Sequence, residues 1–193
     1  MSRTALSDLL GHHTWATITL IEFVRGLGPE ECAWTAPGTY GAIDQTLAHL
    51  VGADTYYLFR LTGEWPSAGE LEEEPSVDLE DLLERAREAA DRYEAYASDP
   101  IDPDEVRESR SGRRETVGTI LAQAIHHGNE HRSQVGTILD AAWTLPSGLL
   151  GLGLGSGTSR ARSDLTEKEA MELALNETHA WRRRAQDRGS IET

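Results

Sequence analysis

The sequence predicts an all-α protein, a four-helix bundle with an appended C-terminal amphipathic helix. Four separate stretches carry apolar residues at intervals of three and four, which is the period of a helix with one buried face. Segments rich in glycine, proline or acidic residues separate these stretches and are typical of loops. Long amphipathic helices joined in this way bury their apolar faces against one another, as in a bundle.

The first half of the chain predicts two long helices. The first is expected over 4–27, with Thr4 or Ser7 as its N-terminal cap and a glycine–proline stop at its end. Residues 30–42 contain glycine and proline and predict a loop or a short turn. The second helix is expected over 42–62, where apolar residues again form one stripe.

The second half of the bundle begins after an acidic linker over 63–77. A third helix is expected over 78–98, with apolar residues inward and charged residues toward water. Residues 99–114 are polar and broken by proline and glycine, so both a short hairpin and a plain loop are open. The fourth helix is expected over 115–142, and the helices are expected to pack as antiparallel neighbours.

The composition changes after the fourth helix. We predict a bundle domain over 1–143, a glycine-rich linker over 144–163 and a helical extension over 164–193. Thr166 and Glu169 form a capping box at the start of the extension. A lone helix of this length is marginal in water, so it should pack on the bundle, a second subunit or a partner. The linker lacks the lysine of a phosphate-binding loop.

Charge and cysteine content restrict the partners and the compartment. The formal net charge is −15 and the sequence pI is about 4.8, so nucleic acids and anionic membranes would be repelled at long range. Cys32 is the single cysteine, which excludes an intrachain disulfide and suits a reducing compartment. No apolar run approaches the roughly 18 residues of a membrane span, and no signal-peptide core is present. We therefore expect a soluble cytoplasmic protein that binds neither nucleic acid nor membrane.

The apolar stripe of the fourth helix becomes polar at its centre, over 127–131. His127 and His131 are four residues apart, so both rings leave the same side of the helix and can bind one metal ion. His49 lies beside the apolar stripe of the second helix and offers a third ligand. Three histidines from two helices would leave an open coordination position, as catalytic metal sites do.

Other interpretations of the histidines are open. The pair on the fourth helix could be polar side chains at a seam or on the surface, and His126 competes with His127 as a ligand. His12 and His13 are adjacent, cannot both face inward and are expected to be structural, although one of them could line the pocket. His179 lies in the extension and is expected to be exposed. The sequence has no H-E-x-x-H motif and lacks the carboxylate pattern of a di-iron bundle.

Two strings resemble motifs of a known family. HGNEHRSQ, from His127 to Gln134, resembles the H-x-x-x-H-R-G-Q signature of the DinB-like proteins, also called YfiT-like. TLAHLVGADTYYLFRLTG, which contains His49, resembles the second-helix motif of that family. Ser133 stands where glycine is usual, which leaves the histidines untouched. The resemblance covers roughly residues 5–143.

The resemblance implies a four-helix bundle with one divalent metal ion held by His49, His127 and His131, and it implies that dimers are common. Members with known chemistry are metal-dependent thiol transferases and isomerases that use low-molecular-weight thiols such as bacillithiol or mycothiol. We therefore expect zinc or nickel, with iron as a further option, a thiol cosubstrate and a small-molecule substrate. No catalytic residue is assigned from the sequence.

Two further residues of the motif invite a prediction. Gln134 shares a face with the histidines and could orient a ligand or bind substrate, or it could make an ordinary hydrogen bond at the helix seam. Arg132 points off that face and is expected to pair with an acidic residue of a neighbouring helix. Three functions are open: a metal-dependent thiol transferase, a non-enzymatic metal- or ligand-binding module, and an interaction protein that uses its C-terminal helix.

Overall fold

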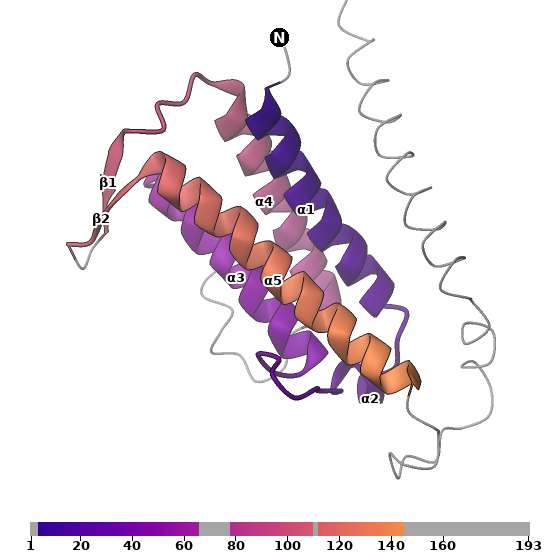
Figure 1. The fold of residues 1–193 in the computed structure, drawn as a ribbon. Coiled ribbons are helices and arrows are strands. Elements are labelled where there is room, and N and C mark those ends of the chain that lie inside the picture. Colours follow the sequence, from indigo (N-terminus) through magenta and orange to yellow (C-terminus); the bar gives the residue numbers. More distant parts are fainter. Residues whose placement is uncertain (1–3, 66–77, 110–111, 145–193) are drawn as a thin grey trace, which may run out of the picture. The chain divides into compact units, whose positions relative to one another are not determined.

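The computed structural model describes residues 4–65, 78–109 and 112–144. Its elements, in chain order, are α1 (Ala5–Val24), α2 (Pro29–Cys32), α3 (Ile43–Thr62), α4 (Leu79–Ser98), β1 (Val106–Glu108), β2 (Arg114–Thr116) and α5 (Val117–Thr144) (Figure 1). The described part is a bundle of long helices with one small hairpin, which confirms the predicted all-α class. Apart from Thr144, the predicted linker over 144–163 and extension over 164–193 lie outside the described residues.

Local capping chemistry determines where the long helices begin and end. The Thr4 hydroxyl accepts a hydrogen bond from the Ser7 backbone N–H at 3.1 Å, which satisfies a first-turn donor of α1. At the start of α4, the Asp78 carboxylate accepts a hydrogen bond from the Glu80 backbone N–H at 2.8 Å. α3 ends at Gly63, whose φ of 77° lies in the left-handed region that glycine adopts without strain. The predicted helix boundaries hold to within a few residues, and α1 ends earlier than predicted, at Val24.

The connections resolve two open expectations. The predicted loop over 30–42 contains the single-turn helix α2 at its start. Of the two possibilities for 99–114, the hairpin is observed: β1 and β2 pair antiparallel, with Val106 opposite Thr116. α5 follows β2 without a gap, so the hairpin fixes where this helix begins. Within the described ranges, no helix has both the length and the apolar character that a membrane crossing requires.

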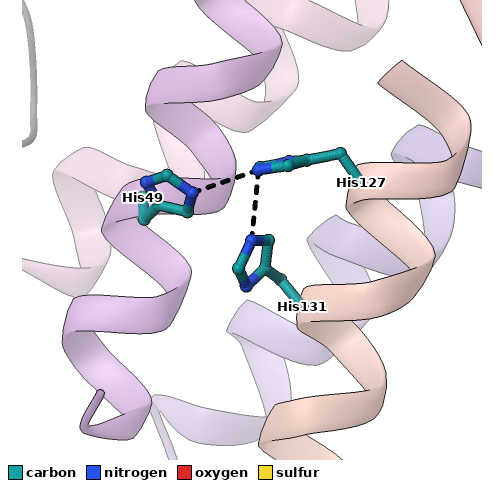
Figure 2. A group of neighbouring side chains, drawn as sticks. All are labelled: His49, His127 and His131. Atoms are coloured by element: carbon teal, nitrogen blue, oxygen red, sulfur yellow. Dashed lines mark hydrogen bonds between the residues drawn. The ribbon is translucent and has the colours of Figure 1, made fainter. Parts of the chain in front are cut away.

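Two antiparallel helix pairs make up the bundle. In the first, α1 packs on α4, and Arg25 near the end of α1 pairs with Glu80 near the start of α4 at 2.6 Å. In the second, α3 packs on α5 (Figure 2). His49 near the start of α3 lies against His127, with 3.0 Å between their Nε2 atoms.

The core consists of two separate groups of buried apolar side chains. The first apolar cluster comprises Ile21, Val24, Cys32, Ile43, Leu47, Ala48, Val51, Leu82, Leu83, Ala86, Val135, Ile138 and Leu139. The second apolar cluster comprises Leu10, Leu58, Leu61, Ala89, Tyr93, Val117, Ile120, Leu121 and Ala124. Each cluster takes side chains from all four long helices of the described part, so each fills one end of the bundle.

The clusters also show that α3 and α4 run parallel. The starts of both helices lie in the first apolar cluster, and their later turns lie in the second. Arg92, late in α4, donates to the Glu64 carbonyl oxygen just beyond α3, at 2.8 Å. The prediction that all neighbours are antiparallel is therefore wrong for this pair. In a parallel pair, the connection has to run back along the whole length of the first helix, which is about 30 Å. The roughly 16 residues between the two helices can span about 50 Å, so the connection is long enough.

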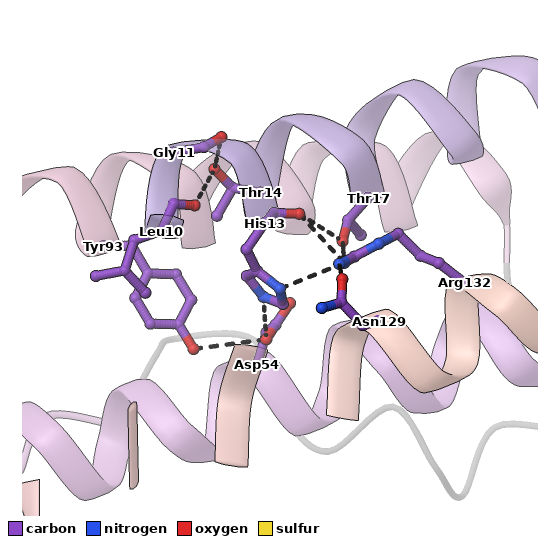
Figure 3. Close-up of polar contacts among 9 residues, drawn as sticks. All are labelled: Leu10, Gly11, His13, Thr14, Thr17, Asp54, Tyr93, Asn129 and Arg132. Atoms are coloured by element: carbon purple, nitrogen blue, oxygen red, sulfur yellow. Dashed lines mark hydrogen bonds and ion pairs between the residues drawn. The ribbon is translucent and has the colours of Figure 1, made fainter. Parts of the chain in front are cut away.

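Between the two apolar clusters lie the polar side chains of His13, Asp54 and Arg132. The hydroxyl of Tyr93, a member of the second apolar cluster, reaches them, so each long helix of the described part contributes one side chain (Figure 3). His13 Nε2 lies 2.9 Å from Asp54 Oδ1, and the Tyr93 hydroxyl lies 3.5 Å from the same oxygen. Arg132 Nη1 donates to the His13 carbonyl oxygen at 3.2 Å and to Thr17 Oγ1 at 2.9 Å. His13, Asp54 and Tyr93 are fully buried, so an unpaired group here would be costly. We call these residues, His13, Asp54, Tyr93 and Arg132, the polar layer.

Gly128 lets α5 approach α1 at this layer. A Cβ added there would lie against the His13 ring, 2.6 Å from its Nδ1, and 2.9 Å from Arg132 Nη1. His13 is held by Asp54 and is 1% exposed, so its ring has little room to move away. Gly136, on the same helix, has open space around the equivalent position. The two glycines therefore provide a matched pair for substitution.

A buried ion pair connects the end of α3 to the hairpin. Arg60 Nη1 lies 2.9 Å from Glu115 Oε2, and the two side chains are 5% and 8% exposed. Burial alone would raise the pKa of Glu115, but the hydrogen bond from Arg60 and the charges of Arg113 and Arg60 lower it below its usual value. Arg60 Nε and Nη2 have no hydrogen-bond partner among the described residues, so desolvation of this guanidinium is only partly offset.

We predict that Gly128→Ala lowers the free energy of unfolding by about 1–3 kcal/mol, because overpacking outweighs the gain in helix propensity of about 1 kcal/mol. Gly136→Ala should instead raise the free energy of unfolding by about 0.5–1 kcal/mol. Urea denaturation of both variants measures this difference. Equal effects of the two substitutions would show that α1 and α5 do not meet closely at Gly128.

We predict that Glu115→Leu lowers the free energy of unfolding by about 3 kcal/mol, because it leaves the Arg60 charge buried without its acidic partner. Arg60→Met should cost less, since Arg113 still lies 2.6 Å from Glu115. The double variant should be more stable than Glu115→Leu alone. Urea denaturation of the four proteins closes the mutant cycle, and a double variant that loses the full sum of the single effects would contradict the buried pair.

Candidate metal site

The structure brings His49, His127 and His131 together between α3 and α5 (Figure 2). His127 Nε2 lies 3.0 Å from His49 Nε2 and 3.1 Å from His131 Nε2. One ring nitrogen from each residue lies within 4.8 Å of the other two. His131 is 6% exposed, and the other two are half-buried. His126, the competing candidate, is exposed to solvent.

The helices impose this arrangement. The four-residue spacing places His127 and His131 one turn apart on α5, with ring centroids 4.3 Å apart. The antiparallel α3 presents His49 from the opposite side, with its ring centroid 4.7 Å from that of His131. We call His49, His127 and His131 the trio. The trio lies at the same level of the bundle as the polar layer, because Gly128, beside His127, leaves too little room for a side chain next to the His13 ring. Only His13 of the adjacent pair faces inward, and His12 is exposed.

The three ring nitrogens are better placed to bind one metal ion than to form hydrogen bonds with one another. Each neutral imidazole nitrogen carries either one proton or one lone pair, so a proton on His127 Nε2 can be donated into only one of its two short contacts. A tetrahedral ion with metal–nitrogen distances of about 2.0–2.1 Å needs ligand nitrogens about 3.3 Å apart. The two separations from His127 Nε2, 3.0 Å to His49 and 3.1 Å to His131, are close to that value. Imidazole ligands suit zinc, nickel, iron and copper.

The surroundings keep the imidazoles of His127 and His131 neutral. Burial, followed by the charges of His131 and His49, lowers the pKa of His127 to about 4. Burial and the charge of His49 also lower the pKa of His131, although its hydrogen bond to Gln134 acts in the opposite direction. A histidine must be neutral to bind a metal ion, so both rings hold the required form at neutral pH.

Gln134 lies directly behind the trio. Its Oε1 accepts a hydrogen bond from the Tyr40 backbone N–H at 3.0 Å and lies 3.1 Å from His131 Nδ1. The structure therefore shows a hydrogen bond to a proposed ligand, which agrees with the ligand-orienting role among those expected for this residue. A role in binding substrate stays a prediction.

Two tyrosines border the trio and were not anticipated as site residues. The Tyr40 ring stacks on His49, with centroids 4.1 Å apart and planes 17° apart, and it meets His131 edge-on. The Tyr57 ring meets His127 edge-on at 5.9 Å. Tyr57 lies two helical turns after His49, a spacing that places both on one face and could have identified it. Tyr40 lies in an irregular segment, where no periodic signal exists.

Among the described residues, Arg132 does not have the acidic partner expected for it. Instead of an acidic side chain, it binds the His13 carbonyl oxygen, Thr17 Oγ1 and, at 2.6 Å, Asn129 Oδ1. The prediction of an ion pair is therefore wrong. The reason is the close approach of α5 to α1 at Gly128, which brings the guanidinium to the backbone of α1.

Comparisons with known proteins agree with this architecture. The family model described as the DinB family matches residues 1–146. A solved structure, the crystal structure of a DinB-like protein from Bacillus cereus ATCC 10987, is 20% identical, with a TM-score of 0.53. The match covers 68% of this chain and 86% of that chain and shows a shared fold. No curated protein matches the chain. Because the family model spans most of the sequence, this chain belongs to the DinB family.

Proposed function

We propose that this protein binds one divalent metal ion through His49, His127 and His131 and acts as a metal-dependent transferase. Zinc or nickel is the favoured ion, ahead of iron, and the proposed cosubstrate is a low-molecular-weight thiol. The convergence of three imidazole nitrogens from two helices is the observation that carries the proposal. Membership of the DinB family supports the metal, and the transferase chemistry rests on the resemblance to members that use thiols.

Three neutral ligands would leave the charge of a bound divalent ion largely uncompensated, and such an ion lowers the pKa of a thiol beside it. The thiolate, rather than the thiol, is the nucleophile. In the proposed reaction its sulfur forms a bond to an electrophilic carbon of a small substrate. The bond from that carbon to the leaving group breaks, the leaving group keeps the electron pair, and the thiol proton passes to water.

The chain supplies rigid positioning for this chemistry. His127 and His131 share one helix, and the polar layer behind them connects the four long helices of the described part. Tyr40 and Tyr57 offer aromatic surface beside the trio, which suits a small and partly apolar substrate. The amide oxygen of Gln134 is engaged by the Tyr40 backbone N–H and by His131 Nδ1, so we propose its amide nitrogen as the group that binds substrate.

The setting that we infer is a homodimer in the cytoplasm. The dimer rests on the family resemblance, and the compartment rests on the thiol cosubstrate and the single, buried Cys32. Analytical ultracentrifugation of the full chain tests the dimer directly, and a monomer at micromolar concentration would exclude it.

We predict about one zinc or nickel ion per chain in the wild-type protein, measured by elemental mass spectrometry after reconstitution and desalting. His49→Ala, His127→Ala and His131→Ala should each lose most of this metal, because two imidazoles hold an ion far less tightly than three. His126→Ala is the matched control, since this exposed histidine lies on the same helix. A wild-type protein without metal would contradict the site, as would an equal loss in the control.

We predict that the metal-loaded protein consumes a low-molecular-weight thiol in the presence of a small electrophile and that the metal-stripped protein does not. Bacillithiol and mycothiol are the first thiols to assay, with loss of free thiol as the measurement. Activity should return when metal is added back and should be absent in His127→Ala. Full metal occupancy without turnover for any thiol would favour a non-enzymatic metal-binding module instead.

A further inference from the structure

The amide oxygen of Gln134 serves two donors that come from different parts of the chain. One is the backbone N–H of Tyr40, in the segment between α2 and α3, at 3.0 Å. The other is Nδ1 of His131, one turn away on the same helix, at 3.1 Å. A carbonyl oxygen has two lone pairs, so it can accept both hydrogen bonds at once.

The backbone contact determines which way the amide group points. A backbone N–H can only donate, so the Gln134 atom that faces Tyr40 has to be the oxygen and not the NH₂ group. The same oxygen faces His131 Nδ1, which must then carry the proton of the ring. A neutral imidazole has one N–H, so His131 Nε2 is left with its lone pair, directed at His127 Nε2 at 3.1 Å.

We infer that Gln134 is a positioning residue that holds His131 in its Nδ1–H form and thereby prepares Nε2 to bind the metal ion. Metal ligands commonly have their second ring nitrogen fixed in this way. The metal-binding part of this inference rests on the proposed function. The protonation of His131 Nδ1 does not, because it follows from the hydrogen bonds alone.

The same Gln134 oxygen also influences His49, the member of the trio on α3. By holding the Tyr40 backbone, Gln134 fixes the segment that places the Tyr40 ring on His49, at 4.1 Å between centroids. The ring also meets His131 edge-on at 5.4 Å. Gln134 therefore acts on one proposed ligand directly and on another through Tyr40. Loss of its oxygen should disturb both sides of the site.

The experiment is NMR of metal-free protein labelled with ¹⁵N-histidine, in which long-range proton–nitrogen correlations identify the protonated ring nitrogen of each histidine. We expect His131 to be protonated at Nδ1 in the wild type and in Gln134→Glu, whose carboxylate can accept the same two hydrogen bonds. Gln134→Leu should lose this preference. Tyr40→Ala should keep it, because the backbone N–H remains.

Zinc affinity, measured by competition with a chromophoric chelator, gives the second readout. We expect Gln134→Leu to weaken zinc binding by about 10–100-fold, as loss of a ligand's hydrogen-bond partner commonly does. Gln134→Glu should restore binding to within a few-fold of the wild type. Thr137→Ala is the matched control, because within the described part of the chain this exposed hydroxyl on α5 donates to the Ser133 carbonyl oxygen of its own helix.

Two results would overturn the inference. One is a wild-type His131 protonated at Nε2, which requires no variant to fold. The other is a Gln134→Leu protein with the wild-type ring protonation and zinc affinity. Failure of the proposed function looks different: the wild type would show the Nδ1–H form but bind no zinc. In that case the hydrogen-bond assignment would stand without the metal.

Discussion

The described bundle depends on the hydrogen bond between His13 and Asp54, 2.9 Å long and almost fully buried. It lies where an apolar core would be the simplest solution, and it separates the two apolar clusters. Two buried polar side chains are tolerated there because each satisfies the other, with Tyr93 and Arg132 completing the layer. Burial and the Asp54 carboxylate also raise the pKa of the Tyr93 phenol well above its usual value, so the phenol stays a donor.

The polar layer determines how the helices that carry the metal site are aligned along one another. Apolar faces can slide along one another at small cost, but a buried polar pair admits one alignment, because any shift leaves its groups unpaired. The position of the trio follows from this alignment, because Gly128 lies close to the His13 ring and is next to His127 in the chain. The Arg60–Glu115 pair fixes α3 to the hairpin farther along, so the antiparallel α3–α5 pair that carries the three histidines is held at two levels.

Periodicity in the sequence predicts the parts of the structure that depend on neighbouring residues. It yields the four long helices, the shared face of His127 and His131, and the choice of His127 over His126. The direction of α4 could not be obtained in this way, because a long linker permits both directions. The partners of Arg132 depend on how closely two helices approach, and this distance is set by a glycine whose role appears only once α1 is placed. Tyr40 acts partly through its backbone, which carries no signature in the sequence.

The metal site is the claim on which the rest of the functional account stands. The most direct test is a crystal structure of the zinc-loaded protein with anomalous diffraction data collected at the zinc absorption edge. We predict one strong peak about 2.0–2.1 Å from Nε2 of each of His49, His127 and His131. A map with no peak among these rings, or with zinc bound by other residues, would contradict the three-histidine metal site.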